Sequence, residues 1–447
     1  MNLSTHRISD QAFSRLAAGG GGRSAVLELS AAQRSKHRLL IRALVEEARA
    51  ARHPHAGLAA QAYGLLSEIE ERAPKDVDRF LCHPAVGAWA LRTCRSLLSG
   101  QDGSGEDPGR LAALAVGVAA SLGVDCHTSI PAHEGTIILP GLGRVALPGG
   151  VHGLVDATVR SSGGSVRLDV GGSTVWMDSA SDAGLWHAIH RVHIADEFSP
   201  LIDDLDPYRW PQEDVAPSPL TGSQLKSWES HLADAWRILT AEHWSVAEEA
   251  AAIISVLTPI TSSSTTQRSA SSRELFGTIA LSDPLDGLTL AATLAHELQH
   301  AKLHALTDVV RLSLPDDGRR YYAPWRPDPR PVNGLIHGAY AFLGVAGFWR
   351  RQHHRQRGES AFRAQVEFAR WREAAYLVTE TLLGSAGLTD AGKAFVGETH
   401  RTLEAWQAEP VEPAAAAAAR RESEAHLDAW TRRNGATAAP GRPDRRR

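Results

Sequence analysis

The most constraining feature of this 447-residue sequence is an apolar stretch that carries two histidines one helical turn apart. Residues 288–306 read LTLAATLAHELQHAKLHAL and contain the motif H-E-x-x-H as His296, Glu297 and His300. The stretch has neither Gly nor Pro and its leucines recur at helical spacing, so we predict a buried helix. Residues four apart share one helix face, so His296 and His300 can ligate one cation. The alternative is a pair of core histidines bonded to neighbouring carbonyls.

His304 extends the series to three histidines at intervals of four. Eight residues at about 1.5 Å each place His304 roughly 12 Å from His296 along the helix axis. Ligand atoms lie only about 2.1 Å from a shared ion, so these two residues cannot hold the same metal. We therefore expect His304 to be a neighbour of the site or a core histidine, and the third ligand to come from elsewhere in the chain.

The composition describes a globular protein with enough apolar material for a large core. Hydrophobic residues make up 43% and charged residues 22%, and the length suggests two to three domains. The net charge of −4 gives no basic field for nucleic acid. Three cysteines indicate neither a disulfide framework nor a cysteine-based zinc site, which fits a reducing cytoplasm. The polar amino terminus and the lack of an apolar run of about 18 residues argue against secretion and a membrane partner.

The apolar periodicity divides the chain into four regions. Residues 1–125 read as a helical region, with helices expected at 35–52, 57–72, 84–99 and 110–122. Residues 126–215 read as a small β-rich region, in which short apolar runs alternate with Gly and Pro. Residues 216–410 form the predicted catalytic helical domain, with a helix over 218–257 and a short strand over 274–282 before the H-E-x-x-H helix. Residues 411–447 add a last helix and a disordered basic tail. The expected fold class is α+β, mostly α-helical, with a zincin-like metal helix and a small antiparallel sheet.

Residues 319–349 form the second informative stretch, rich in Pro, Arg and aromatic residues before it becomes apolar. Arg326 and Arg330 lie on a proline-stiffened loop, where they can either bind a carboxylate of a ligand or pair with Asp316, Asp317 or Asp328 to hold the loop. His337 follows on an apolar helix, flanked by Gly334 and Gly338, whose small size allows close approach. We therefore expect His337 to be the third metal ligand.

Glu380, on a later predicted helix, is the rival third ligand, because two histidines and one carboxylate form a common metal set. Two chemistries can use either set. In a zinc hydrolase, Glu297 would deprotonate metal-bound water for attack on a peptide carbonyl. In a non-haem iron oxygenase, the metal would instead keep open positions for 2-oxoglutarate and O₂, and a cation would bind the far carboxylate of the cosubstrate. Arg326 or Arg330 would supply that cation.

At the level of whole motifs, the chain resembles the HExxH-motif peptide-modification proteins, also described as 2-oxoglutarate-dependent HExxH-type peptide β-hydroxylases. The shared segments are FGTIALSDP at 276–284, LAHELQHAKLHAL at 294–306 and YYAPWRPDPRPVNGLIHGAYAF at 321–342. The amino-terminal segments LAAGGGG at 16–22 and HPAVGAWA at 83–90 are similar too, so the resemblance covers nearly the whole chain.

The resemblance implies Fe(II), 2-oxoglutarate and O₂ as cofactors, metal-ligand roles for His296 and His300, and a ribosomally made precursor peptide as the substrate. Hydroxylation of a β-carbon in that peptide would belong to natural-product maturation, and Glu297 would then have no obligatory role as a base. The alternatives are a zinc metallopeptidase that uses Glu297 as the general base and a non-catalytic peptide-binding partner of a modification complex.

Overall fold

The computed structural model describes residues 6–100, 106–162, 164–177, 184–212, 214–262 and 267–435. The chain divides into two compact units, each built from separate segments. The metal-helix unit comprises Met1–Ala32, Ser227–Ile253 and Pro284–Arg447, and contains the H-E-x-x-H motif. The sheet unit comprises Gln33–Lys226 and Ile254–Asp283.

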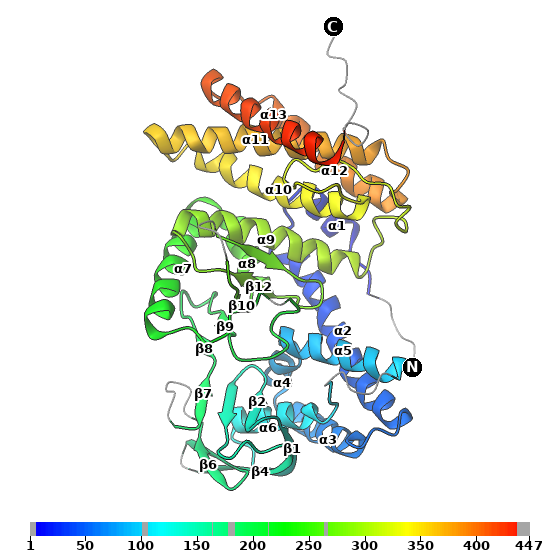
Figure 1. Ribbon diagram of the computed structural model, residues 1–447, viewed down its shortest axis with the longest axis vertical. Helices are drawn as coiled ribbons and strands as arrows, with labels where there is room; N and C mark the ends of the chain where they lie inside the picture. Colours follow the sequence, from blue (N-terminus) through cyan, green and yellow to red (C-terminus); the bar gives the residue numbers. More distant parts are fainter. Residues whose placement is uncertain are drawn as a thin grey trace. The chain divides into compact units, whose positions relative to one another are not determined.

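The metal-helix unit is a stack of helices (Figure 1). It contains α1 (Asp10–Ala17), the first residues of α2 (Gly22–Ala50), most of α7 (Gly222–Glu242), α8 (Trp244–Ile253), α9 (Gly287–Thr307), α10 (Val332–Gln352), α11 (Gly358–Leu383), α12 (Asp390–Gln407) and α13 (Pro413–Asn434). The helix α10 lies between α9 and α11, while α12 and α13 pack on α11. Buried side chains such as Phe348, Phe368 and Phe395 fill the spaces between these helices.

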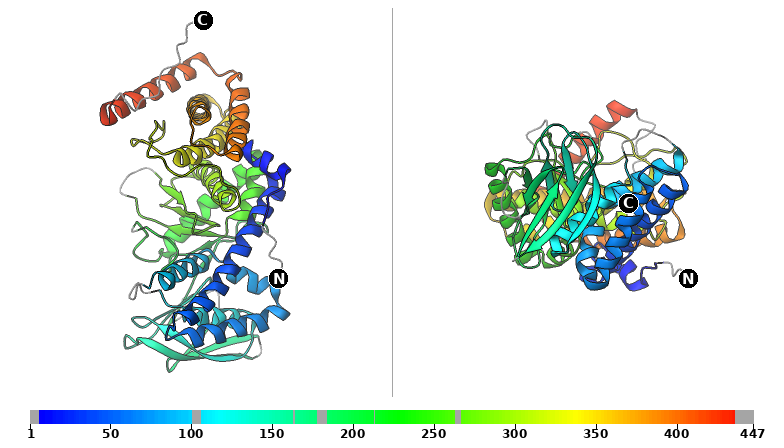
Figure 2. Two further views of the ribbon diagram at one scale, coloured as in Figure 1. Left: turned by 90° about the vertical axis from the view of Figure 1, so that its right-hand side faces the viewer. Right: turned by 90° about the horizontal axis from the view of Figure 1, so that it is seen from below.

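The sheet unit combines short helices with three small sheets. Its helices are the remainder of α2, α3 (Ala56–Arg72), α4 (Pro74–Leu81), α5 (Pro84–Ser99) and α6 (Arg110–Leu122). The sequence of α6, RLAALAVGVAASL, is apolar on nearly all sides, and this helix packs against α3 on one side and against strands on the other. Figure 2 shows the teal strands of this unit gathered beside its blue and cyan helices.

Two of the three sheets are antiparallel and the third is mixed. The four-stranded sheet has the order β1 (Cys126–Ala132), β4 (Gly153–Ser162), β5 (Ser165–Val170) and β6 (Ser173–Trp176). The three-stranded sheet has the order β2 (Thr136–Leu139), β3 (Gly143–Ala146) and β7 (Trp186–Ala188). The five-stranded sheet has the order β11 (Ser269–Ser271), β12 (Thr278–Leu281), β10 (Val256–Pro259), β9 (Leu201–Ile202) and β8 (His190–Arg191). In it β9, β10 and β12 are parallel, and β10 and β12 are buried throughout, as is typical of parallel strands.

The predicted class of α+β, mostly helical with small antiparallel sheets, is confirmed, and the mixed sheet is an addition to it. The predicted helix over 218–257 was wrong at its end, because α8 stops at Ile253 and residues 256–259 form β10. The run Val-Leu-Thr-Pro there favours a strand, since two β-branched residues precede a proline. The predicted basic tail, 436–447, lies outside the described residues. Among the helices that are described, none combines the length and the apolar character needed to cross a bilayer.

Candidate metal centre

The H-E-x-x-H motif lies on α9, as the sequence predicts. The helix begins after Asp286, whose carboxylate accepts a hydrogen bond from the Thr289 backbone N–H at 2.7 Å and so caps the first turn. At Gly287 an added Cβ would lie 2.5 Å from the Asp234 side chain, so this glycine permits close packing on α7. The predicted apolar positions are all buried, at Leu290, Leu294, Leu298 and Leu303.

A buried ion pair joins α9 to α8. The Lys302 ammonium lies 2.6 Å from Oε2 of Glu249 on α8, and neither side chain is more than 3% exposed. Lys302 also donates to the Gly20 carbonyl at 3.0 Å, and Gln299 donates to the Gly19 carbonyl at 2.8 Å. Glu249 in turn accepts a hydrogen bond from the Gly22 backbone N–H at 2.8 Å. The glycine segment is therefore fixed to the motif helix and is more than a spacer between α1 and α2.

The rest of the LAAGGGG segment is held in the same way. Tyr340 on α10 donates to the Leu16 carbonyl at 2.7 Å, and Thr399 on α12 donates to the Ala17 carbonyl at 2.8 Å. These carbonyls belong to the last turn of α1, where a helix leaves its acceptors without internal partners. Gly19 has a positive φ of 92°, and a Cβ there would collide with Leu343. Through its backbone the segment is thus bonded to four helices of the metal-helix unit, α8, α9, α10 and α12.

Four imidazoles gather where α9 faces α10. The ring centroids of His296 and His300 are 4.8 Å apart, and that of His337 is 5.8 Å from His300. His304 lies 4.5 Å from His337 and 6.4 Å from His300, which agrees with the expectation that it is a neighbour of the group. The two helices approach closely because Gly344 on α10 faces α9, where a Cβ would lie 2.6 Å from Gln299. His337 therefore lies on α10, beside the two histidines of the motif.

Burial favours the neutral form of His296 and His300. It lowers the pKa of His296 below its ordinary value of 6.5. The pKa of His300 falls well below 6.5, because burial disfavours its charged form and the neighbouring His296, His337 and His304 add to this effect. A neutral imidazole is the form that binds a metal ion, so the group is prepared for a cation without having to lose protons.

An aromatic layer covers one side of the histidines. Phe342 meets the His296 ring edge at a centroid distance of 5.1 Å and stacks on Trp325 at 4.9 Å. Trp371 on α11 lies 4.2 Å from Phe342. A Cβ at Gly338 would collide with the Trp325 indole, so this glycine, the residue after His337, lets the ring lie against α10. All three rings are half-buried, and they leave apolar surface beside His296.

The two loop arginines pair with an aspartate of their own loop. Arg326 Nε lies 2.9 Å from Oδ1 of Asp328, and Arg330 Nη1 lies 3.1 Å from Oδ2 of the same carboxylate. Half of the Arg326 side chain is exposed. Arg330 is more buried and lies across Gly334, where an added Cβ would be 3.1 Å from Arg330 Nε. Of the two guanidiniums, that of Arg330 therefore lies against the first turn of α10, one turn before His337.

The two predicted carboxylates differ in their surroundings. Glu297 is buried on α9, with 2% of its surface exposed. Glu380, the rival third ligand, is exposed on α11, and its carboxylate is hydrogen bonded to Tyr376. This environment favours His337 over Glu380 as the third ligand.

The histidines of α9 and α10 are close, but they are not a group whose ligand atoms all lie within 4.8 Å of one another. Within the described residues, the one group of metal-ligating side chains whose ligand atoms all lie within 4.8 Å of one another is His53, His55 and Asp107. The His337 ring lies nearer to His304 than to His300. Sequence reasoning missed the second group, whose histidine pair and aspartate are separated by about fifty positions of chain.

No protein-family model and no curated protein matches this chain.

Proposed function

We propose that this protein is an Fe(II)- and 2-oxoglutarate-dependent hydroxylase that acts on a peptide. The observation that carries the proposal is the position of His300, which has three other imidazoles from two helices around it and is kept neutral by burial. Imidazole nitrogens are suitable ligands for iron and for zinc. His296, His300 and His337 would hold the metal.

The donor set leaves coordination positions for further ligands, since it supplies three protein nitrogens. Bound Fe(II) and 2-oxoglutarate would supply the activation of O₂, with the overall conversion of a substrate C–H to C–OH and of 2-oxoglutarate to succinate and CO₂. Arg330 would bind the far carboxylate of 2-oxoglutarate, which would take the place of Asp328 as its partner. A partly exposed ion pair exchanges partners at small cost, because such pairs contribute about 0–1 kcal/mol.

The aromatic layer gives the site its substrate side. Phe342, Trp325 and Trp371 would exclude water beside His296 and offer flat apolar surface to a peptide side chain. We also propose that the metal helix and the strand before it are zincin-like. The order of elements supports this, because β12 directly precedes α9 in the chain and pairs on one side with the antiparallel edge strand β11.

A zinc metallopeptidase is the second candidate, favoured by the buried Glu297 beside His296 on α9. One experiment separates the two. The full chain is loaded anaerobically with Fe(II) and mixed with 2-oxoglutarate, O₂ and a candidate precursor peptide, and the peptide is weighed by mass spectrometry. A gain of one oxygen with matching succinate supports the hydroxylase. Cleaved fragments that form without 2-oxoglutarate would identify a peptidase.

A further inference from the structure

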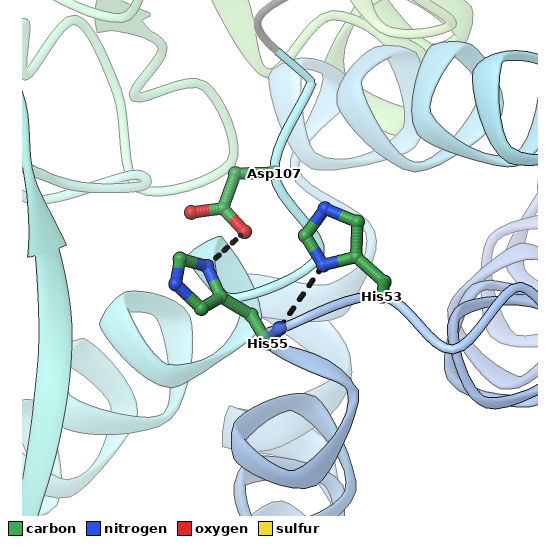
Figure 3. A group of neighbouring side chains, drawn as sticks. All are labelled: His53, His55 and Asp107. Atoms are coloured by element: carbon green, nitrogen blue, oxygen red, sulfur yellow. Dashed lines mark hydrogen bonds and ion pairs between the residues drawn. The ribbon is translucent and has the colours of Figure 1, made fainter. Parts of the chain in front are cut away.

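We propose that His53, His55 and Asp107 form a second metal site, in the sheet unit, for a divalent transition ion with the ligand preferences of Zn²⁺. One nitrogen of each imidazole and one carboxylate oxygen lie within 4.8 Å of one another, and all three residues are half-buried (Figure 3). Ligand atoms about 2.1 Å from one tetrahedral ion are roughly 3.4 Å apart. To form the site, the longest separation would shorten by up to about 1.4 Å and the 2.7 Å between His55 Nδ1 and Asp107 Oδ1 would lengthen, and small rotations of the three side chains can provide both changes.

The backbone fixes the two histidines before any ion binds. Two residues after the end of α2, Arg52 adopts a positive φ of 54°, which is rare for a residue with a side chain. The chain is then held by the hydrogen bond from the His53 N–H to the Ala48 carbonyl at 2.9 Å. Pro54 fixes its own φ and restricts His53, the residue before it. His55 directly precedes α3, whose first turn includes the bond from the Ala59 N–H to the His55 carbonyl. The sequence His-Pro-His thus forms a rigid bend.

Hydrogen bonds also hold Asp107 in position. Its backbone carbonyl accepts a hydrogen bond from the Trp89 indole at 3.2 Å, and its carboxylate accepts one from the Gly109 backbone N–H at 2.7 Å. The same oxygen lies 2.7 Å from Nδ1 of His55. The hydrogen bond from the Gly109 N–H would orient Asp107 from outside the ligand set, whereas the contact with His55 Nδ1 would give way to the ion.

Gly109 provides the space for this cluster. Its backbone is right-handed helical, with φ of −60°, so its conformation does not require glycine. An added Cβ would instead lie 3.0 Å from His55 Nδ1 and 3.0 Å from the Asp107 carboxylate. The absence of a side chain at this position therefore keeps the two donors close to each other.

The donors open onto a cavity of about 600 Å³ in the sheet unit. His55 and Asp107 line one part of it, and His133, Glu134 and His152 line another. The cavity gives an ion a route to the cluster and leaves room for water in the coordination positions that the protein does not fill. Two imidazoles and one carboxylate with open positions form a donor set that Zn²⁺ and Fe²⁺ both accept, and the carboxylate gives the cluster the charge that attracts them.

The test counts metal ions per chain in the full-length protein. Bound metal is removed with a chelator and the chain is titrated with Zn²⁺. Isothermal titration calorimetry and elemental analysis give the number of ions bound, and circular dichroism confirms that the chain is folded. The wild type is expected to bind two ions, and both His55→Ala and Asp107→Asn are expected to bind one, with at least a tenfold loss of affinity at the second site. Asp107→Asn retains the acceptor for the Gly109 N–H, so it removes the charge with little change to α6. His152→Ala, in the same cavity but outside the cluster, should retain both ions.

A stoichiometry in His55→Ala and Asp107→Asn equal to that of the wild type would overturn the proposal. The result also remains separate from the proposed function, because His300→Ala affects the other site. If α9 holds no metal, the wild type binds a single ion that His55→Ala removes and His300→Ala does not. If the cluster holds no metal, the wild type binds at most the ion that His300→Ala removes.

Discussion

Replacing Lys302 by Met should destabilise the metal-helix unit strongly, because it leaves a buried carboxylate without its cation. Lys302 is 1% exposed and its ammonium lies 2.6 Å from Glu249 Oε2. Breaking a buried pair by removal of one partner costs about 3–5 kcal/mol. The Gly20 carbonyl also loses its donor, at a cost of about 1 kcal/mol that overlaps with the first. We expect a loss of about 4 kcal/mol in the free energy of unfolding.

Urea denaturation followed by far-UV circular dichroism and tryptophan fluorescence measures this loss. The matched control is Lys393→Met, which removes an exposed lysine 3.3 Å from Asp390 and should cost less than about 0.5 kcal/mol. The double variant Lys302→Met/Glu249→Gln removes both charges and retains an amide oxygen for the Gly22 N–H. It should recover a large part of the loss. A Lys302→Met variant within about 1 kcal/mol of the control, or a double variant no more stable than the single one, would refute the reasoning.

Three further predictions concern the candidate metal centre and the pH dependence of stability in the sheet unit. Gly338→Ala forces the Trp325 indole away from α10, so it should lower the free energy of unfolding by about 1–3 kcal/mol and weaken metal binding at His337. The control is Gly397→Ala in α12, where the added Cβ has no neighbour within 4 Å, and it should be neutral or slightly stabilising. Equal effects of the two substitutions in urea denaturation would contradict this prediction. Glu297→Gln should leave iron bound and reduce hydroxylation only in part, as judged by metal analysis and peptide mass, whereas complete loss of turnover with the metal still bound would favour the peptidase. Stability in the sheet unit should fall with acid, because burial lowers the pKa of His37 and of His83 to about 4. Between pH 6.5 and 4 the unfolded chain then holds imidazole protons at these two positions that the folded chain lacks, and this outweighs the opposite contribution of Asp203, whose pKa is raised by burial. His83→Gln should reduce that slope in urea denaturation, and a slope equal to that of the wild type would show the assignment to be wrong.

The sequence was informative where the signal is local. The apolar spacing of residues 288–306 predicted α9, and the helical period placed His296 beside His300. The glycines around His337 indicated close approach, and its ring does lie beside His300. The pairing of Arg326 and Arg330 with Asp328 was one of two open alternatives, which only the positions of the side chains can decide.

The contacts that join distant segments could not be predicted in this way. The carbonyls of Gly19 and Gly20 meet Gln299 and Lys302, which lie some 280 positions away, and no periodicity reports such a bond. The His-Pro-His bend and Asp107 are each ordinary turn sequences, and only the fold brings them together. The first two residues of the strand at 256–259 were predicted as the end of a helix, because a short apolar run has no period that separates the two structures.

The central claim is that α9 and α10 hold an iron ion that binds 2-oxoglutarate. Anaerobic equilibrium dialysis of labelled 2-oxoglutarate against the full chain, with and without Fe(II), tests this most directly when it is done in the His55→Ala background, which excludes the second cluster. The account predicts one 2-oxoglutarate per chain only when Fe(II) is present, and loss of both ligands in His55→Ala/His300→Ala. Retention of iron and 2-oxoglutarate after the His300 substitution, or binding of 2-oxoglutarate that does not depend on iron, would contradict it.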